Sequence, residues 1–75
     1  MNTTEKNLVT ASKTAIDNFN SYLTKENATI AAIEVSLSFR AGFDLYGKNF
    51  ANHFTSKEIT TYNVAKKIHL DYSAK

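Results

Sequence analysis

The side chains of this 75-residue chain that could do chemistry are few and scattered. Its two histidines, His53 and His69, form neither a His-x-x-x-His nor a Glu-x-x-His pair that could bind a metal. Ser and Thr are plentiful, but no Gly-x-Ser-x-Gly elbow is present, and two glycines are too few for a phosphate-binding loop. A three-helix chain of this size should also have little room for a substrate pocket of about 300 Å³ or more. The sequence therefore predicts no enzymatic activity, no cofactor and no metal site.

An aromatic stripe runs through the middle of the chain. It repeats at steps of four, three, four and four residues, which is helical spacing, and consists of Phe39, Phe43, Tyr46, Phe50 and Phe54. A second, aliphatic row lies beside it: Ile30, Ile33, Leu37, Ala41 and Leu45. The stripe can simply be core. Two apolar rows on one segment are, however, more than two neighbouring helices can easily cover, so part of the stripe can also dock on a partner.

The docking interpretation gives a set of candidate partner-binding residues. Aromatic side chains beside an arginine have the composition of interface hot spots, and the set is Phe39, Arg40, Phe43, Tyr46 and Phe50. We expect at least one of its aromatics, first of all Tyr46 or Phe43, to be largely exposed in the free protein. The simplest interpretation of Arg40 is a surface ion pair with Asp44, four residues later.

The charge of the chain is uneven. Residues 1–38 carry three basic against four acidic side chains, a net charge of −1, whereas residues 39–75 carry six against three, a net charge of +3. A basic half is weak support for an acidic partner such as nucleic acid. The candidate nucleic-acid contacts are Lys57, Lys66 and Lys67.

Residues 64–73, VAKKIHLDYS, resemble the first helix and turn of a helix-turn-helix DNA-binding motif. Ala65 would be the small residue at the helix crossing, and the apolar residues holding the two helices together would be Val64, Ile68 and Leu70. His69 stands where the motif usually has glycine, and the sequence gives at most one turn of the recognition helix that enters the major groove. The resemblance implies a DNA-binding regulator, and an ordinary amphipathic helix end is the other interpretation.

Composition limits the class of protein. Seventy-five residues fit one domain, here residues 1–75, and 12% aromatic residues are too many for a disordered chain. There is no cysteine, so neither disulfides nor thiolate metal sites can stabilise a core this small. We therefore expect the chain to be stabilised by forming a homodimer. No apolar run is long enough to span a membrane and the first residues are polar, so the expected location is cytoplasmic.

The absence of proline and the presence of only two glycines favour a few long helices. We predict an all-α three-helix bundle with helices near 4–23, 28–53 and 56–70, the middle helix bending near Gly42 or Gly47. Thr3 or Thr4 can cap the first helix, residues 24–27 read as a connection, and Thr55 with Glu58 forms a capping box for the third. The alternative is an α+β fold with a strand through 33–41, where apolar and polar residues alternate.

The first helix is predicted to bury a stripe, with Ile16 widening it and Val9 outside it. The stripe consists of Leu8, Ala11, Ala15, Phe19, Tyr22 and Leu23. His53 is expected near a helix C-terminus and His69 at the surface or in a turn. Together these features predict a small accessory or regulatory protein that binds and inhibits or modulates another protein. Its richness in Asn, Lys, Ile and Thr is typical of phage and mobile-element products. The alternatives are the DNA-binding regulator and a structural homo-oligomer.

Overall fold

The computed structural model describes residues 2–21 and 25–74, and they are almost entirely helical. The order is α1 (Thr3–Ser21), α2 (Lys25–Tyr46), the 3₁₀ helix η1 (Gly47–His53) and α3 (Ser56–Ser73). The prediction of an all-α three-helix fold is confirmed. The strand alternative through 33–41 is wrong, because this segment lies inside α2. Its alternating pattern also fits a helix, with Val35 and Phe39 buried on one side and Leu37 exposed on the other.

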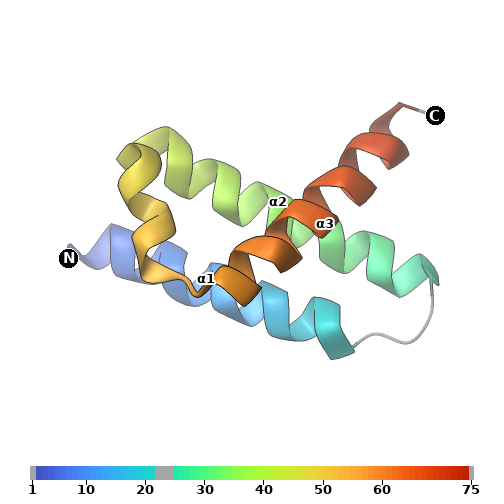
Figure 1. The fold of residues 1–75 in the computed structure, drawn as a ribbon, viewed down its shortest axis with the longest axis horizontal. Coiled ribbons are helices and arrows are strands. Elements are labelled where there is room, and N and C mark those ends of the chain that lie inside the picture. Colours follow the sequence, from blue (N-terminus) through green and yellow to red (C-terminus); the bar gives the residue numbers. More distant parts are fainter. Residues whose placement is uncertain (1, 22–24, 75) are drawn as a thin grey trace.

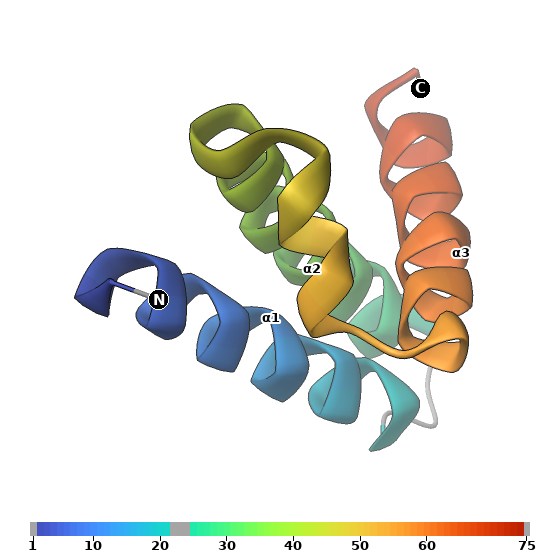
Figure 2. The same cartoon turned by 60° about the vertical axis from the view of Figure 1, so that its left-hand side comes forward.

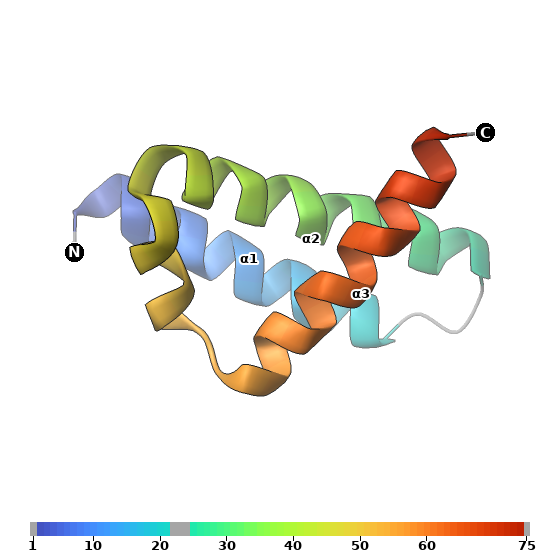
Figure 3. The same ribbon diagram turned by 45° about the horizontal axis from the view of Figure 1, so that its top comes forward.

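Helix α2 is the centre of the molecule. It runs antiparallel to α1 along its length, and α3 crosses it obliquely (Figure 1). Figure 2 shows α1 and α3 diverging on either side of α2, and α2 packs extensively against both of them while these two barely touch each other. Figure 3 shows η1 folding back from the end of α2 toward the start of α3. Two helices and one 3₁₀ segment therefore share the surface of α2.

The ends of the helices follow capping chemistry. The Glu58 backbone N–H donates to Thr55 Oγ1 at 3.1 Å and the Thr55 N–H donates to Glu58 Oε1 at 2.8 Å, so the predicted capping box is confirmed. The hydrogen bond from the Thr55 N–H, helped by Lys13, holds the pKa of Glu58 below its ordinary value. The capping prediction for Thr3 or Thr4 is wrong: the Glu5 N–H donates to Asn2 Oδ1 at 2.7 Å, so Asn2 caps α1.

The middle segment ends earlier than the predicted range of 28–53. Helix α2 ends at Tyr46, because the next residue, Gly47, has a φ of 66°. This is the left-handed region, which glycine adopts without strain. Of the two predicted bending points, Gly47 is therefore the break. Gly42 lies inside α2, and the Phe50 ring packs where a Cβ on Gly42 would stand. Its missing side chain lets η1 approach α2 closely.

Other boundaries also shift. Helix α2 already includes residues 25–27, predicted as a connection, and α3 continues to Ser73. Tyr22 to Thr24 lie outside the described residues. None of the helices in the ranges 2–21 and 25–74 is long and apolar enough to cross a bilayer.

One cluster of buried side chains forms the core. It consists of Val9, Ala15, Ile16, Ala32, Val35, Phe39, Phe50 and Ala65. Two predictions about the buried face of α1 are wrong. Val9 was predicted to lie outside this face but is buried, and Ala11 was predicted to be buried but is exposed. The buried face is centred on Ser12, which has no exposed surface, and Val9 and Ile16 lie three and four residues from it on the side of α1 that packs against α2. Within the described part of the chain, Ser12 Oγ is a buried oxygen without a hydrogen-bond partner.

Candidate functional site

The aromatic stripe forms the core of the bundle. Phe39 has no exposed surface, and its ring centroid lies 4.5 Å from that of Phe54 and 4.5 Å from that of Tyr62. The Phe50 ring meets Phe39 edge-on at 6.0 Å. Tilted, stacked and edge-to-face contacts at these distances are the favourable arrangements of buried rings. The aromatic row therefore holds α2, η1 and α3 together.

This placement corrects the expectation that a stripe aromatic is largely exposed. Phe39 and Phe50 are fully buried, and Phe43 and Tyr46 are half-buried. The physical reason is η1, which folds back over the aromatic row and gives it a third neighbour besides α1 and α3. Of the predicted partner-binding residues only Arg40 is largely exposed, with 75% of its side-chain surface accessible to solvent. Its Nε lies 4.0 Å from Asp44 Oδ2. That distance makes the predicted pair a weak surface contact.

Part of the aliphatic row of α2 remains uncovered instead, whereas Ile33 and Ala41 of the same row are half-buried. Ile30 is 55% exposed, Leu37 48% and Leu45 63%. Successive members are seven and eight residues apart, close to two helical turns, so they lie on one side of α2. Phe39 is buried on the opposite side. The structure therefore leaves an aliphatic ridge, defined as Ile30, Leu37 and Leu45, along the outward face of the central helix.

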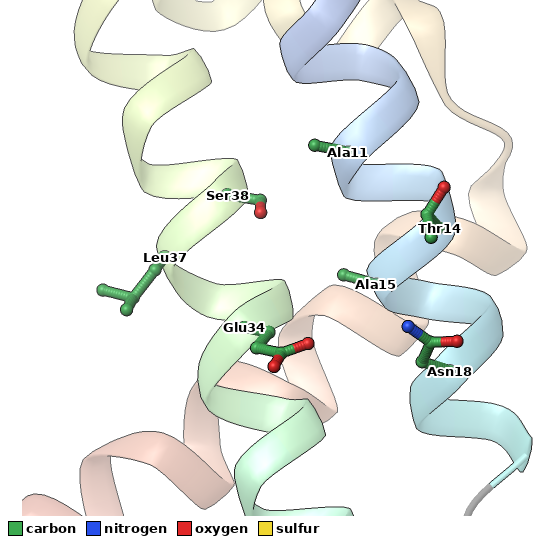
Figure 4. Close-up of a pocket in the computed structure, with 7 residues that line it drawn as sticks. All are labelled: Ala11, Thr14, Ala15, Asn18, Glu34, Leu37 and Ser38. Atoms are coloured by element: carbon green, nitrogen blue, oxygen red, sulfur yellow. The ribbon is translucent and has the colours of Figure 1, made fainter.

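A groove of about 480 Å³ between α1 and α2 borders the ridge. Its lining consists of Ala11, Thr14, Ala15, Asn18, Glu34, Leu37 and Ser38. In Figure 4, Ser38 and Glu34 extend from α2 toward α1, and Leu37 points away from α1. The small side chains of Ala11, Ala15 and Ser38 keep the groove open. The groove is open to the surface, so the expectation that this chain has little room to enclose a substrate pocket of about 300 Å³ or more stays a prediction.

A second hollow, of about 340 Å³, lies between α2 and α3, and we call it the α2–α3 cleft. It is lined by Ser36, Arg40, Phe43 and Asp44 of α2 and by Tyr62, Lys66, His69 and Leu70 of α3. The cleft brings together Arg40 and Phe43 of the predicted partner-binding set with Lys66 of the predicted nucleic-acid set. Sequence reasoning did not find Tyr62, His69 and Leu70 as site residues.

The three lysines proposed for nucleic acid do not form one patch on α3. Lys57 and Lys66 are nine residues, or two and a half turns, apart, which places them on opposite sides of the helix. Lys67 follows Lys66 directly, and neither it nor Lys57 lines the cleft. Helix α3 also runs through His69 without a turn, so the turn implied by the helix-turn-helix resemblance is absent from this segment. The segment is one continuous helix.

Both histidines make tertiary contacts. His53 ends η1, as expected, and its Nε2 lies 2.9 Å from Glu5 Oε2, which ties η1 to the first turn of α1. His69 is half-buried within α3 rather than in a turn, and its Nδ1 lies 2.9 Å from Ser36 Oγ. The described residues contain no group of three or more His, Cys, Asp or Glu side chains placed to share a metal ion.

No family model, curated protein or solved structure gives a significant match to this chain.

Proposed function

We propose that this protein acts without catalysis, as a small accessory or regulatory protein that binds and modulates another protein through the outward face of α2. The observation that carries the proposal is the aliphatic ridge. Three large aliphatic side chains, each about half exposed or more, lie on one side of the helix that also holds the whole core together. Large apolar side chains exposed along one face of a helix are typical of interaction sites.

The energetics of the ridge support binding. Completely burying a Leu or Ile side chain is worth about 1.5–3 kcal/mol, so covering the exposed halves of Ile30, Leu37 and Leu45 would contribute about 3 kcal/mol in total. The groove beside Leu37 adds concave surface that a partner side chain can enter. Small side chains in its lining allow a partner helix to approach closely.

The size of the exposed surface supports the same proposal. A compact monomer of 8.4 kDa should expose about 4,600 Å², whereas this chain exposes 5120 Å². The chain therefore exposes about 500 Å² more surface, over the whole molecule, than the average for a monomer of its mass.

The test uses Leu37→Glu with Val64→Glu as its matched control. Val64 is 49% exposed on α3, against 48% for Leu37, so the two substitutions differ in location and not in exposure. Both variants should melt like the wild type, as followed by circular dichroism. In affinity capture from the producing cell followed by mass spectrometry, we expect one partner to be retained by the wild type and by Val64→Glu and lost with Leu37→Glu. Equal capture by both variants would contradict the proposal.

Sedimentation and DNA-binding measurements test the two alternative roles, a structural homo-oligomer and a DNA-binding regulator. If the wild type sediments as a dimer and Leu37→Glu as a monomer, the partner is a second copy of the chain, and the structural homo-oligomer is the better description. We expect no measurable affinity for duplex DNA near physiological salt. Salt-sensitive binding that depends on Lys66 and Lys67 would favour the DNA-binding regulator. The phage or mobile-element origin and the cytoplasmic location stay predictions from the sequence.

A further inference from the structure

The α2–α3 cleft has an apolar wall. The ring centroids of Phe43 and Tyr62 lie 5.7 Å apart, and both rings line the hollow. Leu70 extends this wall, and its side chain is 59% exposed. The volume of about 340 Å³ is in the range of small-ligand sites, in which apolar walls and a few converging polar groups set the specificity. One side of the cleft can therefore accept an apolar group of a ligand.

The rim of the same cleft is cationic. Arg40 enters from α2 and Lys66 from α3, and among the described residues of the lining the one carboxylate is that of Asp44. Asp44 carries one negative charge, against the two positive charges of Arg40 and Lys66. Its contact with Arg40 is also weak, because Nε and Oδ2 are 4.0 Å apart and the side chains of Arg40 and Asp44 are each more than 70% exposed. Among the described residues, Lys66 has no carboxylate within ion-pair distance, and its Nζ lies 6.0 Å from the Tyr62 ring centroid. The cleft thus has more positive than negative charge.

His69 completes the polar side. Its Nδ1 is engaged with Ser36 Oγ, a nearly buried hydroxyl, which orients the ring and leaves Nε2 as the nitrogen available to a ligand. Three nitrogen-bearing side chains from two helices therefore surround one hollow beside an aromatic wall.

We propose that the α2–α3 cleft binds a carboxylate attached to an apolar body, as an acidic residue next to an apolar one presents on a protein partner. The cationic rim attracts the carboxylate, and the wall of Phe43 and Tyr62 contacts the apolar body. The inference rests on the proposed function for its natural ligand and adds the chemistry of the partner. The binding site itself can be tested without the partner.

The probe is 3-phenylpropionate, with 3-phenylpropionamide as its uncharged match. Each is titrated into the ¹⁵N-labelled full chain, and the backbone amide signals are followed by NMR. We expect 3-phenylpropionate to bind with a Kd in the low millimolar range, the ordinary strength of a ligand of this size. It should shift the amide signals around Arg40, Phe43, Tyr62 and Lys66, whereas the amide compound should bind at least about threefold more weakly because it lacks the charge.

The variants separate this site from general surface charge. Lys66→Gln should raise the Kd about threefold, and so should Arg40→Gln. Lys67→Gln removes the same charge one residue along α3, outside the lining, and should leave the Kd unchanged. The proposal is overturned if the two probes bind equally, if Lys67→Gln weakens binding as much as Lys66→Gln, or if the shifts lie around the α1–α2 groove. A DNA duplex that shifts the cleft signals when 3-phenylpropionate does not would show that the ligand is a phosphate.

The two proposals fail in different ways. If Leu37→Glu keeps every partner but 3-phenylpropionate binds in the cleft, the ridge is not the docking surface and the cleft site stands. If Leu37→Glu loses the partner and 3-phenylpropionate does not bind, protein binding through α2 stands and the cleft proposal is wrong.

Discussion

The replacement of Gly42 by Ala tests the contact that closes η1 over the aromatic row. A Cβ at Gly42 would overlap three atoms of the Phe50 ring, and Phe50 is fully buried, so its ring has no open space to enter. In an exposed helix interior, Gly→Ala stabilises by about 1 kcal/mol. A ring forced out of its site forfeits most of the 3–5 kcal/mol or so that a buried Phe contributes. The net expectation for Gly42→Ala is a destabilisation of about 2–4 kcal/mol.

Thermal and urea unfolding, followed by far-ultraviolet circular dichroism, measure this change. For a chain of this length, 2 kcal/mol corresponds to a fall in Tm of about 10 °C. Introducing Gly42→Ala into a Phe50→Leu background should cost clearly less, because the smaller side chain leaves room for the new methyl group. A Gly42→Ala variant that melts at or above the wild-type temperature would refute the close packing of η1 on α2.

Three further substitutions have distinct expected signs. Gly47→Ala should destabilise by about 1–2 kcal/mol through the backbone alone, because φ is 66° and nothing lies within 4 Å of an added Cβ; a Tm equal to that of the wild type would contradict this. Ser12→Ala should stabilise the fold by about 1 kcal/mol or more, as measured by urea unfolding. It removes a buried hydroxyl that has no hydrogen-bond partner among the described residues, and alanine has the higher helix propensity. A loss of stability would show that the hydroxyl is paired. Glu58→Gln keeps a side-chain oxygen for the capping box but removes the charge that faces Lys13 and the start of α3, so it should destabilise at neutral pH by about 0.3–1 kcal/mol. Because the folded-state pKa of Glu58 lies below its ordinary value of 4.5, its contribution is present above that value and is lost as the pH falls through the lower pKa. The urea midpoints of the two proteins should therefore converge in acid, and a gap that stays constant would contradict the shift.

Local patterns in the sequence determined the helical elements. The capping box at Thr55 and Glu58 locates the start of α3, because both partners of that motif lie within four residues of each other. Gly47 could be named as a breaking point because a left-handed residue is a local requirement. The two apolar rows of the middle segment were also visible from spacing alone. These features depend on short-range chemistry, which the sequence displays directly.

Which of the two rows became core was decided by tertiary structure. The spacing of the two rows is equally helical. Only the packing of η1 onto α2 buries Phe39 and Phe50 of the first row, whereas Leu37 and Leu45 of the second stay exposed. That choice depends on the fit of Phe50 over Gly42, a contact between two elements that no periodicity displays. The α2–α3 cleft likewise joins Arg40 to Lys66, 26 positions away in the sequence. Their proximity follows from the crossing of two helices, so the candidate site is a property of packing rather than of a motif.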